Sequence, residues 1–204
     1  YEKLNVKHRG PLIDPCVEYS ARQAIRLSSV ARNGRILDYG CSVGRAAKVF
    51  HENGYDVYGV DVIQVNLEKA RPFCKEIFLR TQQSIPLPFK GESFDLIFSS
   101  QVIEHLHRRD GNAFLAESYR LLKWGGGIYL TTQNPHYIRV LMKKLPMIRG
   151  NHLSSWIIEE MAASLANAGF KKAFWRGNGR MATLIGDWIP IRWIYGGYAM
   201  LAAK

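Results

Sequence analysis

The stretch Ile36–Arg45 reads I-L-D-Y-G-C-S-V-G-R, an apolar run followed by a turn with two glycines. The run is typical of a buried strand, and Gly44 stands where the next helix should begin. Gly40 permits a tight turn and lets a ligand approach the backbone closely. A strand, a glycine turn and a helix in this order predict a nucleoside site at the carboxyl end of a parallel sheet. The glycines by themselves are also compatible with an ordinary strand-to-helix turn that binds no ligand.

Two carboxylates flank this turn. Asp61 follows the next apolar run, about 20 residues after the turn, where an acid accepts hydrogen bonds from both hydroxyls of a ribose. Asp38 lies near the end of the first strand, where it can bind the ammonium group of a ligand directly or through water. Either side chain could instead be a structural cap. Their joint placement around the turn favours the ligand site.

Short β-type runs alternate with longer helical stretches along the chain, which predicts βαβ units around a largely parallel sheet. A leading helix is expected over 17–32, closed by Asn33-Gly34, and a tight turn over Trp124–Gly127. Ser155 is expected to cap a later helix. The remaining helices are predicted at 44–53, 65–71, 111–123 and 154–168, and the strands at 35–39, 57–60, 77–80, 94–99, 128–132, 172–176 and 198–203.

The composition is that of a globular protein. With 204 residues, of which 47% are hydrophobic, the chain is expected to form a single domain over 1–204. Cys16, Cys41 and Cys74 form no metal-ligand or disulfide pattern, so no metal site and a cytoplasmic location are expected. No signal peptide and no apolar run of about 18 residues is present. The formal charge of +11 suggests an anionic partner, although solubility alone could account for it.

Residues 38–44 and 61 together resemble the class I S-adenosylmethionine-dependent methyltransferases, especially those that modify small molecules, quinones and lipids. In that family an acidic residue precedes Gly-x-Gly-x-Gly, and a second acid follows the second strand. Here Asp38, Gly40, Gly44 and Asp61 match, while Ser42 replaces the usual central glycine. The resemblance implies a Rossmann-like, mostly parallel seven-stranded sheet with helices on both faces and an antiparallel last strand.

The resemblance extends over roughly Ile36–Thr132. The segment Ile85–Leu106 is similar to the family's segment around the fourth strand, and Leu121–Thr132 to its following helix, turn and fifth strand. Gln83 stands where relatives hold the adenine amine with an acid. The resemblance therefore implies S-adenosylmethionine as cofactor, S-adenosylhomocysteine as product, and cofactor contacts by Asp38, Gly40, Cys41, Ser42, Gly44, Asp61, Val62, Gln83, Ser84, Ser100 and Gln101.

Methyl transfer from a sulfonium needs little protein chemistry beyond alignment of donor and acceptor. A hydroxyl acceptor benefits from a base, and His105, after the fourth strand, is the candidate catalytic residue. A structural role for this histidine is the alternative. His107 has the same ambiguity, and His136 and His152 are candidates to line the acceptor pocket.

Two inserts, 135–153 and 181–197, are expected to cover the acceptor site. The first carries no acidic residue and alternates basic with apolar residues, which suggests a lid that meets an anionic or membrane-associated acceptor; a solvated helix is the alternative. The second is apolar and is a candidate pocket wall, dimer surface or membrane contact.

We therefore expect methyl transfer to a hydroxyl or amino group of a small-molecule or lipid-linked acceptor, either neutral or anionic. The enzyme is expected to be a monomer or homodimer in peripheral contact with an anionic membrane. An RNA methyltransferase is an alternative. The sequence contains no RNA-binding motif, so nucleic acid is not an expected partner. A non-catalytic module with the same fold is a third hypothesis, which Ser42 and Gln83 keep open.

Overall fold

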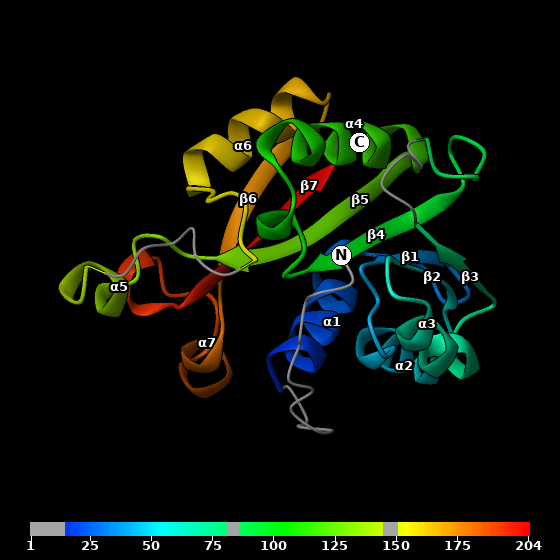
Figure 1. Ribbon diagram of the computed structural model, residues 1–204, viewed down its shortest axis with the longest axis horizontal. Helices are drawn as coiled ribbons and strands as arrows, with labels where there is room; N and C mark the ends of the chain where they lie inside the picture. Colours follow the sequence, from blue (N-terminus) through cyan, green and yellow to red (C-terminus); the bar gives the residue numbers. More distant parts are fainter. Residues whose placement is uncertain (1–14, 81–85, 145–150) are drawn as a thin grey trace.

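A computed structural model describes residues 15–80, 86–144 and 151–204, and its centre is one seven-stranded sheet (Figure 1). The strand order is β3-β2-β1-β4-β5-β7-β6. The strands are β1 (Arg35–Tyr39), β2 (Asp56–Asp61), β3 (Glu76–Leu79), β4 (Phe94–Ser100), β5 (Leu122–Gln133), β6 (Lys171–Asn178) and β7 (Gly197–Ala203).

Only the last strand runs against the others. The neighbouring pairs from β3 to β5 are parallel, whereas β7 pairs antiparallel with both β5 and β6. This is the predicted α/β fold: a Rossmann-like, mostly parallel sheet with an antiparallel last strand. The strand order reverses at β1, between β2 and β4, and ligands of such sheets bind at this switch point outside the carboxyl ends of the strands.

Helices cover both faces of the sheet (Figure 1). On one face lie α1 (Pro15–Ser28), α2 (Arg45–Glu52) and α3 (Gln64–Ala70), with the short helix η1 (Arg71–Phe73); on the other lie α4 (Arg108–Leu121) and α6 (Ile158–Asn167). The turns η2 (Ile103–His105) and η3 (Arg192–Ile194) follow β4 and α7. The short helices α5 (Ile138–Met142) and α7 (Arg180–Ile185) extend to one side of the sheet.

Alternation along the strands builds two hydrophobic cores. In β5, Ile128 and Leu130 join the core under α4 and α6, while Tyr129 joins the core under α1 and α2. The same period of two places Leu37 and Tyr39 of β1 on the first face. Because both faces are covered, the strands read as continuous apolar runs in the sequence. Among the described residues, no helix is both long and apolar enough to cross a membrane.

Three local predictions were wrong. The leading helix ends at Ser28 rather than near residue 32, because Ser29 takes a left-handed conformation (φ 52°) and Asn33 does so again (φ 64°). Residues 124–127 do not form a separate turn but belong to β5, where the pairing with β4 is irregular between Phe94 and Leu96. The helix expected over 154–168 begins only at Ile158, and Ser155 does not cap it.

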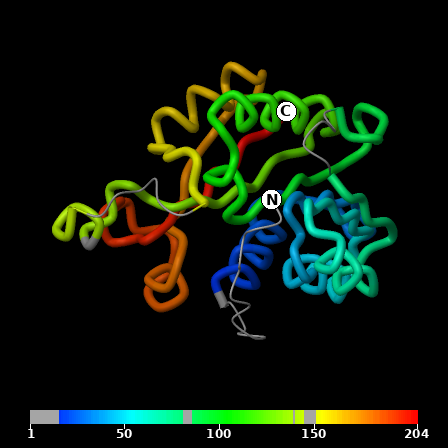
Figure 2. Tube along the Cα trace, in the orientation of Figure 1, coloured from blue at the N-terminus to red at the C-terminus, as the bar shows by residue number. Residues whose placement is uncertain are grey.

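The path of the chain can be followed in the tube of Figure 2, where residues 35–80 gather at one end of the sheet and residues 135–144 and 151–200 lie mainly at the other. The first part contains the glycine turn and Asp61, and the second contains both predicted inserts. Candidate donor-binding residues and candidate acceptor-covering segments therefore come from different halves of the sequence.

Two glycines with nearly the same backbone conformation offer a matched stability test. A Cβ on Gly44 (φ +83°) would lie 2.7 Å from the Cα of Ala70, whereas a Cβ on Gly54 (φ +82°) would meet nothing within 4 Å. We expect Gly54→Ala to cost about 1–2 kcal/mol of unfolding free energy from the backbone conformation alone. Gly44→Ala should cost about 2 kcal/mol more, because α2 and α3 must separate. Urea denaturation measures both, and equal losses would contradict the close helix contact at Gly44.

Candidate functional site

Asp61 joins the turns that follow β1 and β2. Its Oδ2 accepts a hydrogen bond from the backbone N–H of Ser42 (2.8 Å), and its Oδ1 accepts one from the N–H of Ile63 (2.9 Å). The side chain is 9% exposed. Each carboxylate oxygen has a second lone pair, so the group keeps acceptor capacity toward a ligand hydroxyl.

Asp38 is a buried carboxylate with an unsatisfied oxygen. It is 2% exposed, the backbone N–H of Ala47 donates to it, and its Oδ2 has no hydrogen-bond partner among the described residues. Burial raises the pKa of Asp38 to about 7, and the nearby negative charge of Asp61 adds to that rise. A buried acceptor with this deficit suits a cationic ligand group, and the ammonium of the methionine part of S-adenosylmethionine fits it.

Every second residue of the glycine turn takes a left-handed conformation: Gly40 (φ 79°), Ser42 (φ 47°) and Gly44 (φ 83°). The N–H of Gly40 donates to the carbonyl of Val60 (2.7 Å), which ties the turn to β2. A Cβ on Gly40 would lie 2.3 Å from Val102 Cγ2, so the close approach that glycine allows here is made by the protein itself. Similarly, the missing Cβ of Gly44 makes room for Ala70 at the end of α3.

The turn after β4 lies beside the end of β5. The hydroxyls of Ser100 and Thr131 are hydrogen-bonded at 2.9 Å, and the backbone N–H of Gln101 donates to the carbonyl of Thr131 (3.0 Å). Gln101 takes a left-handed conformation (φ 57°) and its side chain is exposed. The two predicted residues of this turn thus stand at the same sheet edge as the glycine turn, because β4 is the neighbour of β1.

Two predicted residues differ in exposure. Val62 is 53% exposed directly after Asp61, where an apolar side chain can lie against a flat ring. Cys41 is buried, and its sulfur and that of Cys74 both approach Gly59. Burial raises the pKa of Cys41 strongly and that of Cys74 to about 12, so both stay thiols that pack within the protein. Gln83 and Ser84 lie outside the described residues.

His105 is brought together with two residues from the first insert. Its Nδ1 lies 3.1 Å from the carbonyl of Asn151, and its ring contacts the ring of His152 with centroids 4.9 Å apart. Glu104, which precedes His105, is 3% exposed, and its Oε2 accepts a hydrogen bond from the hydroxyl of Thr132 (3.0 Å). Glu104 and Thr132 were not among the predicted site residues.

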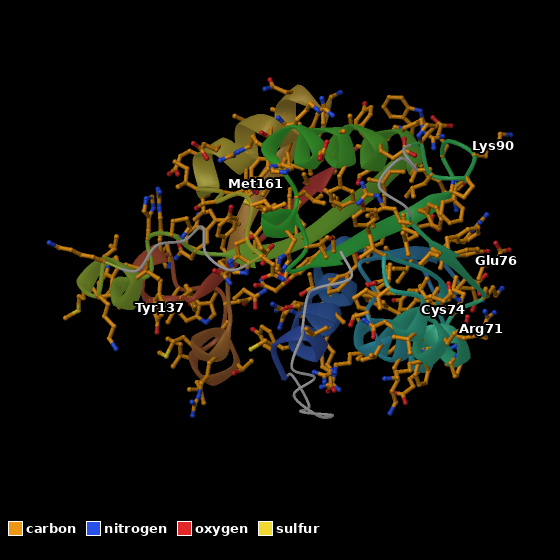
Figure 3. The ribbon with its side chains drawn as sticks, viewed as in Figure 1. Arg71, Cys74, Glu76, Lys90, Tyr137 and Met161 are labelled. Carbon is orange, nitrogen blue, oxygen red and sulfur yellow. The ribbon has the colours of Figure 1, made fainter. Side chains whose placement is uncertain are left out.

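Hydrogen bonds join the residue before the first insert to the second insert. The side-chain amide of Asn134, at the end of β5, donates to the carbonyls of Arg192 (2.6 Å) and Tyr195 (2.9 Å). In Figure 3 the labelled Tyr137 lies beyond the end of the sheet, away from Met161 on α6. The described parts of both inserts therefore meet beyond the carboxyl end of β5.

The comparisons with known proteins agree with this arrangement. The methyltransferase domain family matches residues 17–173, so the chain belongs to that family: it is a class I S-adenosylmethionine-dependent methyltransferase. The cofactor of this class is S-adenosylmethionine, which leaves as S-adenosylhomocysteine.

Among curated proteins, a ubiquinone biosynthesis O-methyltransferase of Bartonella quintana is 36% identical over 106 residues, 50% of this chain and 42% of that protein. Another from Ruegeria sp. (strain TM1040) is 33% identical over 150 residues, 66% of this chain and 59% of that protein. The chain thus spans about half the length of the curated relatives it matches.

Solved structures share the fold at low identity. A SAM-dependent methyltransferase from Archaeoglobus fulgidus superimposes with a TM-score of 0.73 at 19% identity, covering 94% of both chains. A TehB-like SAM-dependent methyltransferase from Corynebacterium glutamicum gives 0.63 at 18% identity, over 91% of this chain and 86% of that one.

The raised pKa of Asp38 predicts a pH-dependent stability. Its folded pKa of about 7 exceeds the 3.8 of an exposed aspartate in the unfolded chain, so the folded protein holds the proton more tightly. This contribution to stability is complete below about pH 4 and is lost as the pH rises through 7. Asp38→Asn removes the effect. Relative to the parent, the variant should gain of the order of 2–4 kcal/mol in unfolding free energy between pH 4 and pH 8. Urea titrations of the cofactor-free proteins measure this difference, and a constant difference would contradict the buried, uncompensated carboxylate.

Proposed function

We propose that this chain transfers the methyl group of S-adenosylmethionine to the oxygen of a hydroxyl group on a small-molecule or lipid-linked acceptor. The observation that carries the proposal is the pair of carboxylates around the glycine turn, with one buried oxygen of Asp38 unsatisfied by the described residues. Relatives named ubiquinone biosynthesis O-methyltransferases support oxygen as the acceptor atom and a lipid-linked acceptor.

In this proposal the residues of the glycine turn and of β2 hold the donor. Asp61 accepts hydrogen bonds from the ribose hydroxyls while it keeps those from the backbone N–H groups of Ser42 and Ile63. Asp38 accepts the ammonium group, and Ser100 and Gln101 border the methionine part. Val62 lies against the adenine, and Gln83 and Ser84 remain sequence-based candidates for its polar edge.

The bound sulfonium supplies an activated methyl group, so the remaining task of the chain is to align the acceptor and to receive its proton. The segment around His105 stands between β4 and β5, beside the turn that borders the methionine part. An imidazole there can take the proton of the acceptor hydroxyl, as the position of His105 in the sequence suggests.

Asp61→Asn tests the donor site. The amide keeps the size of the side chain but leaves one oxygen to serve the backbone and the ribose, so the affinity for S-adenosylmethionine should fall about 10- to 100-fold. Calorimetric titration with S-adenosylmethionine and S-adenosylhomocysteine measures it. Asp56→Asn, at the opposite end of β2, is the matched control and should bind like the parent. Unchanged binding by Asp61→Asn would refute the assignment, and no binding by the parent would favour a non-catalytic module.

We also propose that the inserts contact an anionic membrane surface that carries the acceptor. Met142 is 77%, Leu184 68% and Trp188 70% exposed, and Lys143 and Lys144 are exposed beside the first of them. Met142 lies beside lysines on a segment without acidic residues, and the acid next to Trp188, Asp187, is buried, so apolar and basic side chains are exposed here as on helices that bind the interface of anionic bilayers.

Vesicle cosedimentation tests this contact. The double variant Met142→Ser/Trp188→Ser should lose about tenfold or more of the partitioning onto vesicles of phosphatidylglycerol and phosphatidylcholine, because it removes two large apolar contacts. Trp124→Ser is the matched control: Trp124 is 68% exposed near the start of β5, at the other end of that strand. Equal partitioning of both variants, or none by the parent at low salt, would contradict the proposed surface.

A further inference from the structure

Asp38 lies at the point of the sheet where the strand order reverses. In β1 it stands opposite Gly59 of β2, two residues before Gly40 of the glycine turn. Its side chain belongs to the face covered by α2, because the backbone N–H of Ala47 donates to the carboxyl. This one group is therefore placed between the strand that ends in Asp61 and the helix that follows the glycine turn.

The carboxylates of Asp38 and Asp61 differ in what offsets their charge. Asp61 accepts a backbone hydrogen bond with each of its two oxygens. Asp38 is 2% exposed, and its Oδ2 has no hydrogen-bond partner among the described residues. None of the ion pairs between described residues includes Asp38. Burial of an ionised carboxylate costs far more than burial of a neutral carboxylic acid, so Asp38 keeps its proton until a cation binds.

The titratable neighbours of Asp38 supply no cation. The sulfur atoms of Cys41 and Cys74 lie 3.0 and 3.1 Å from the position that a Cβ on Gly59 would take, opposite Asp38. Burial raises the pKa of both thiols, so both stay neutral. Asp61 is the charged side chain that acts on Asp38, and its negative charge adds to the rise of the Asp38 pKa. Of the titratable groups that act on Asp38 among the described residues, none carries a positive charge.

The cation that Asp38 lacks is part of the ligand. An ammonium group carries three N–H donors and a full positive charge. It supplies both the hydrogen bond that Oδ2 lacks and the opposite charge that a buried carboxylate needs. A protonated Asp38 offers the ammonium no negative charge, so the ligand binds the ionised form more tightly than the neutral form. Binding of the ammonium and loss of the Asp38 proton are therefore linked.

We propose that the ammonium group of the ligand displaces the proton of Asp38, and that this exchange makes Asp38 the residue that selects amino-acid nucleosides over nucleosides without an amine. The inference rests on the proposed function, in which this site holds S-adenosylmethionine. In the exchange the ligand keeps all hydrogens of its ammonium and donates one to Oδ2, while the proton of Asp38 leaves to the solvent. One proton is released for each ligand bound, and the charges of the carboxylate and the ammonium cancel.

Calorimetry with three ligands tests the exchange. S-adenosylhomocysteine and its decarboxylated analogue carry the amine, whereas 5′-methylthioadenosine shares the adenosine and the sulfur but has no amine. Titrations in two buffers of different ionisation enthalpy should show that each amine releases about one proton at pH 5.5 and that 5′-methylthioadenosine releases none. Between pH 5.5 and pH 7 the affinity for the amines should rise about 15-fold, whereas that for 5′-methylthioadenosine should change less than about twofold.

Two variants show whether the released proton comes from Asp38. Asp38→Asn has no proton to release, so it should bind S-adenosylhomocysteine without proton release and with an affinity that changes less than about twofold between pH 5.5 and pH 7. Asp56→Asn is the matched control at the opposite end of β2, where Asp56 pairs with Lys75 (2.6 Å), and it should release the proton like the parent. Equal release by the parent and Asp38→Asn, or with and without the amine, would overturn the inference while the proposed function stands.

A second measurement follows the proton of Asp38 directly. Carboxyl carbon chemical shifts of aspartate-labelled protein report the ionisation of each side chain, and Asp38→Asn assigns the signal. We expect a pKa of about 7 for Asp38 in the ligand-free protein, and an ionised Asp38 at pH 5.5 once S-adenosylhomocysteine is bound. Titration near pH 4 in the ligand-free protein would overturn the inference even if all three ligands bind. Absence of binding by all three ligands would overturn it together with the proposed function.

Discussion

The two hydrogen bonds from Ser42 and Ile63 to the Asp61 carboxylate fix the geometry on which the donor site depends. β1 and β2 are parallel with Tyr39 opposite Val60, so Asp61 ends level with the start of the glycine turn. The left-handed conformation of Ser42 costs about 1–2 kcal/mol without glycine. A hydrogen bond to a charged acceptor contributes about 1.5–3 kcal/mol, enough to offset that cost and to explain why serine is tolerated here.

At Asp38, by contrast, hydrogen bonds do not offset the cost of burying the carboxylate. Its carboxylate is almost fully buried with one oxygen unsatisfied by the described residues, so the folded protein without ligand favours the protonated form. This is a local loss of stability at a position where a cationic ligand group would restore the missing interaction. The same imbalance recurs at Glu104, where burial raises the pKa and one oxygen lacks a partner. In both places, a buried carboxylate oxygen without a partner lowers the stability of the fold.

The sequence predicted the sheet and the donor side well because their signals are local. Apolar runs mark strands buried on both faces, and Asp38 and Asp61 stand at fixed distances from Gly40. The glycines near Trp124 were misread as a turn; in the structure, a Cβ on Gly126 would lie 2.9 Å from the carbonyl oxygen of Asp95, a contact between strands that local sequence does not reveal. The hydrogen bonds from Leu153 and Ser154 to the carbonyl of Glu104 could not be predicted for the same reason: they require this segment to fold back onto the turn after β4.

In the proposed function the inserts select the acceptor, and the second insert lies beyond the residues that the family model matches. The family match ends at residue 173, before the second insert. That insert is nevertheless firmly attached: the buried Asp187 lies 3.5 Å from Arg26 of α1, its carbonyl accepts from Gly177 (2.9 Å), and the hydroxyl of Tyr195 donates to Gly186 (2.8 Å). A segment held by α1, β6 and its own tyrosine acts as a fixed wall rather than a loose loop. In the proposed function, the shape of this attached segment selects the acceptor at this edge of the sheet.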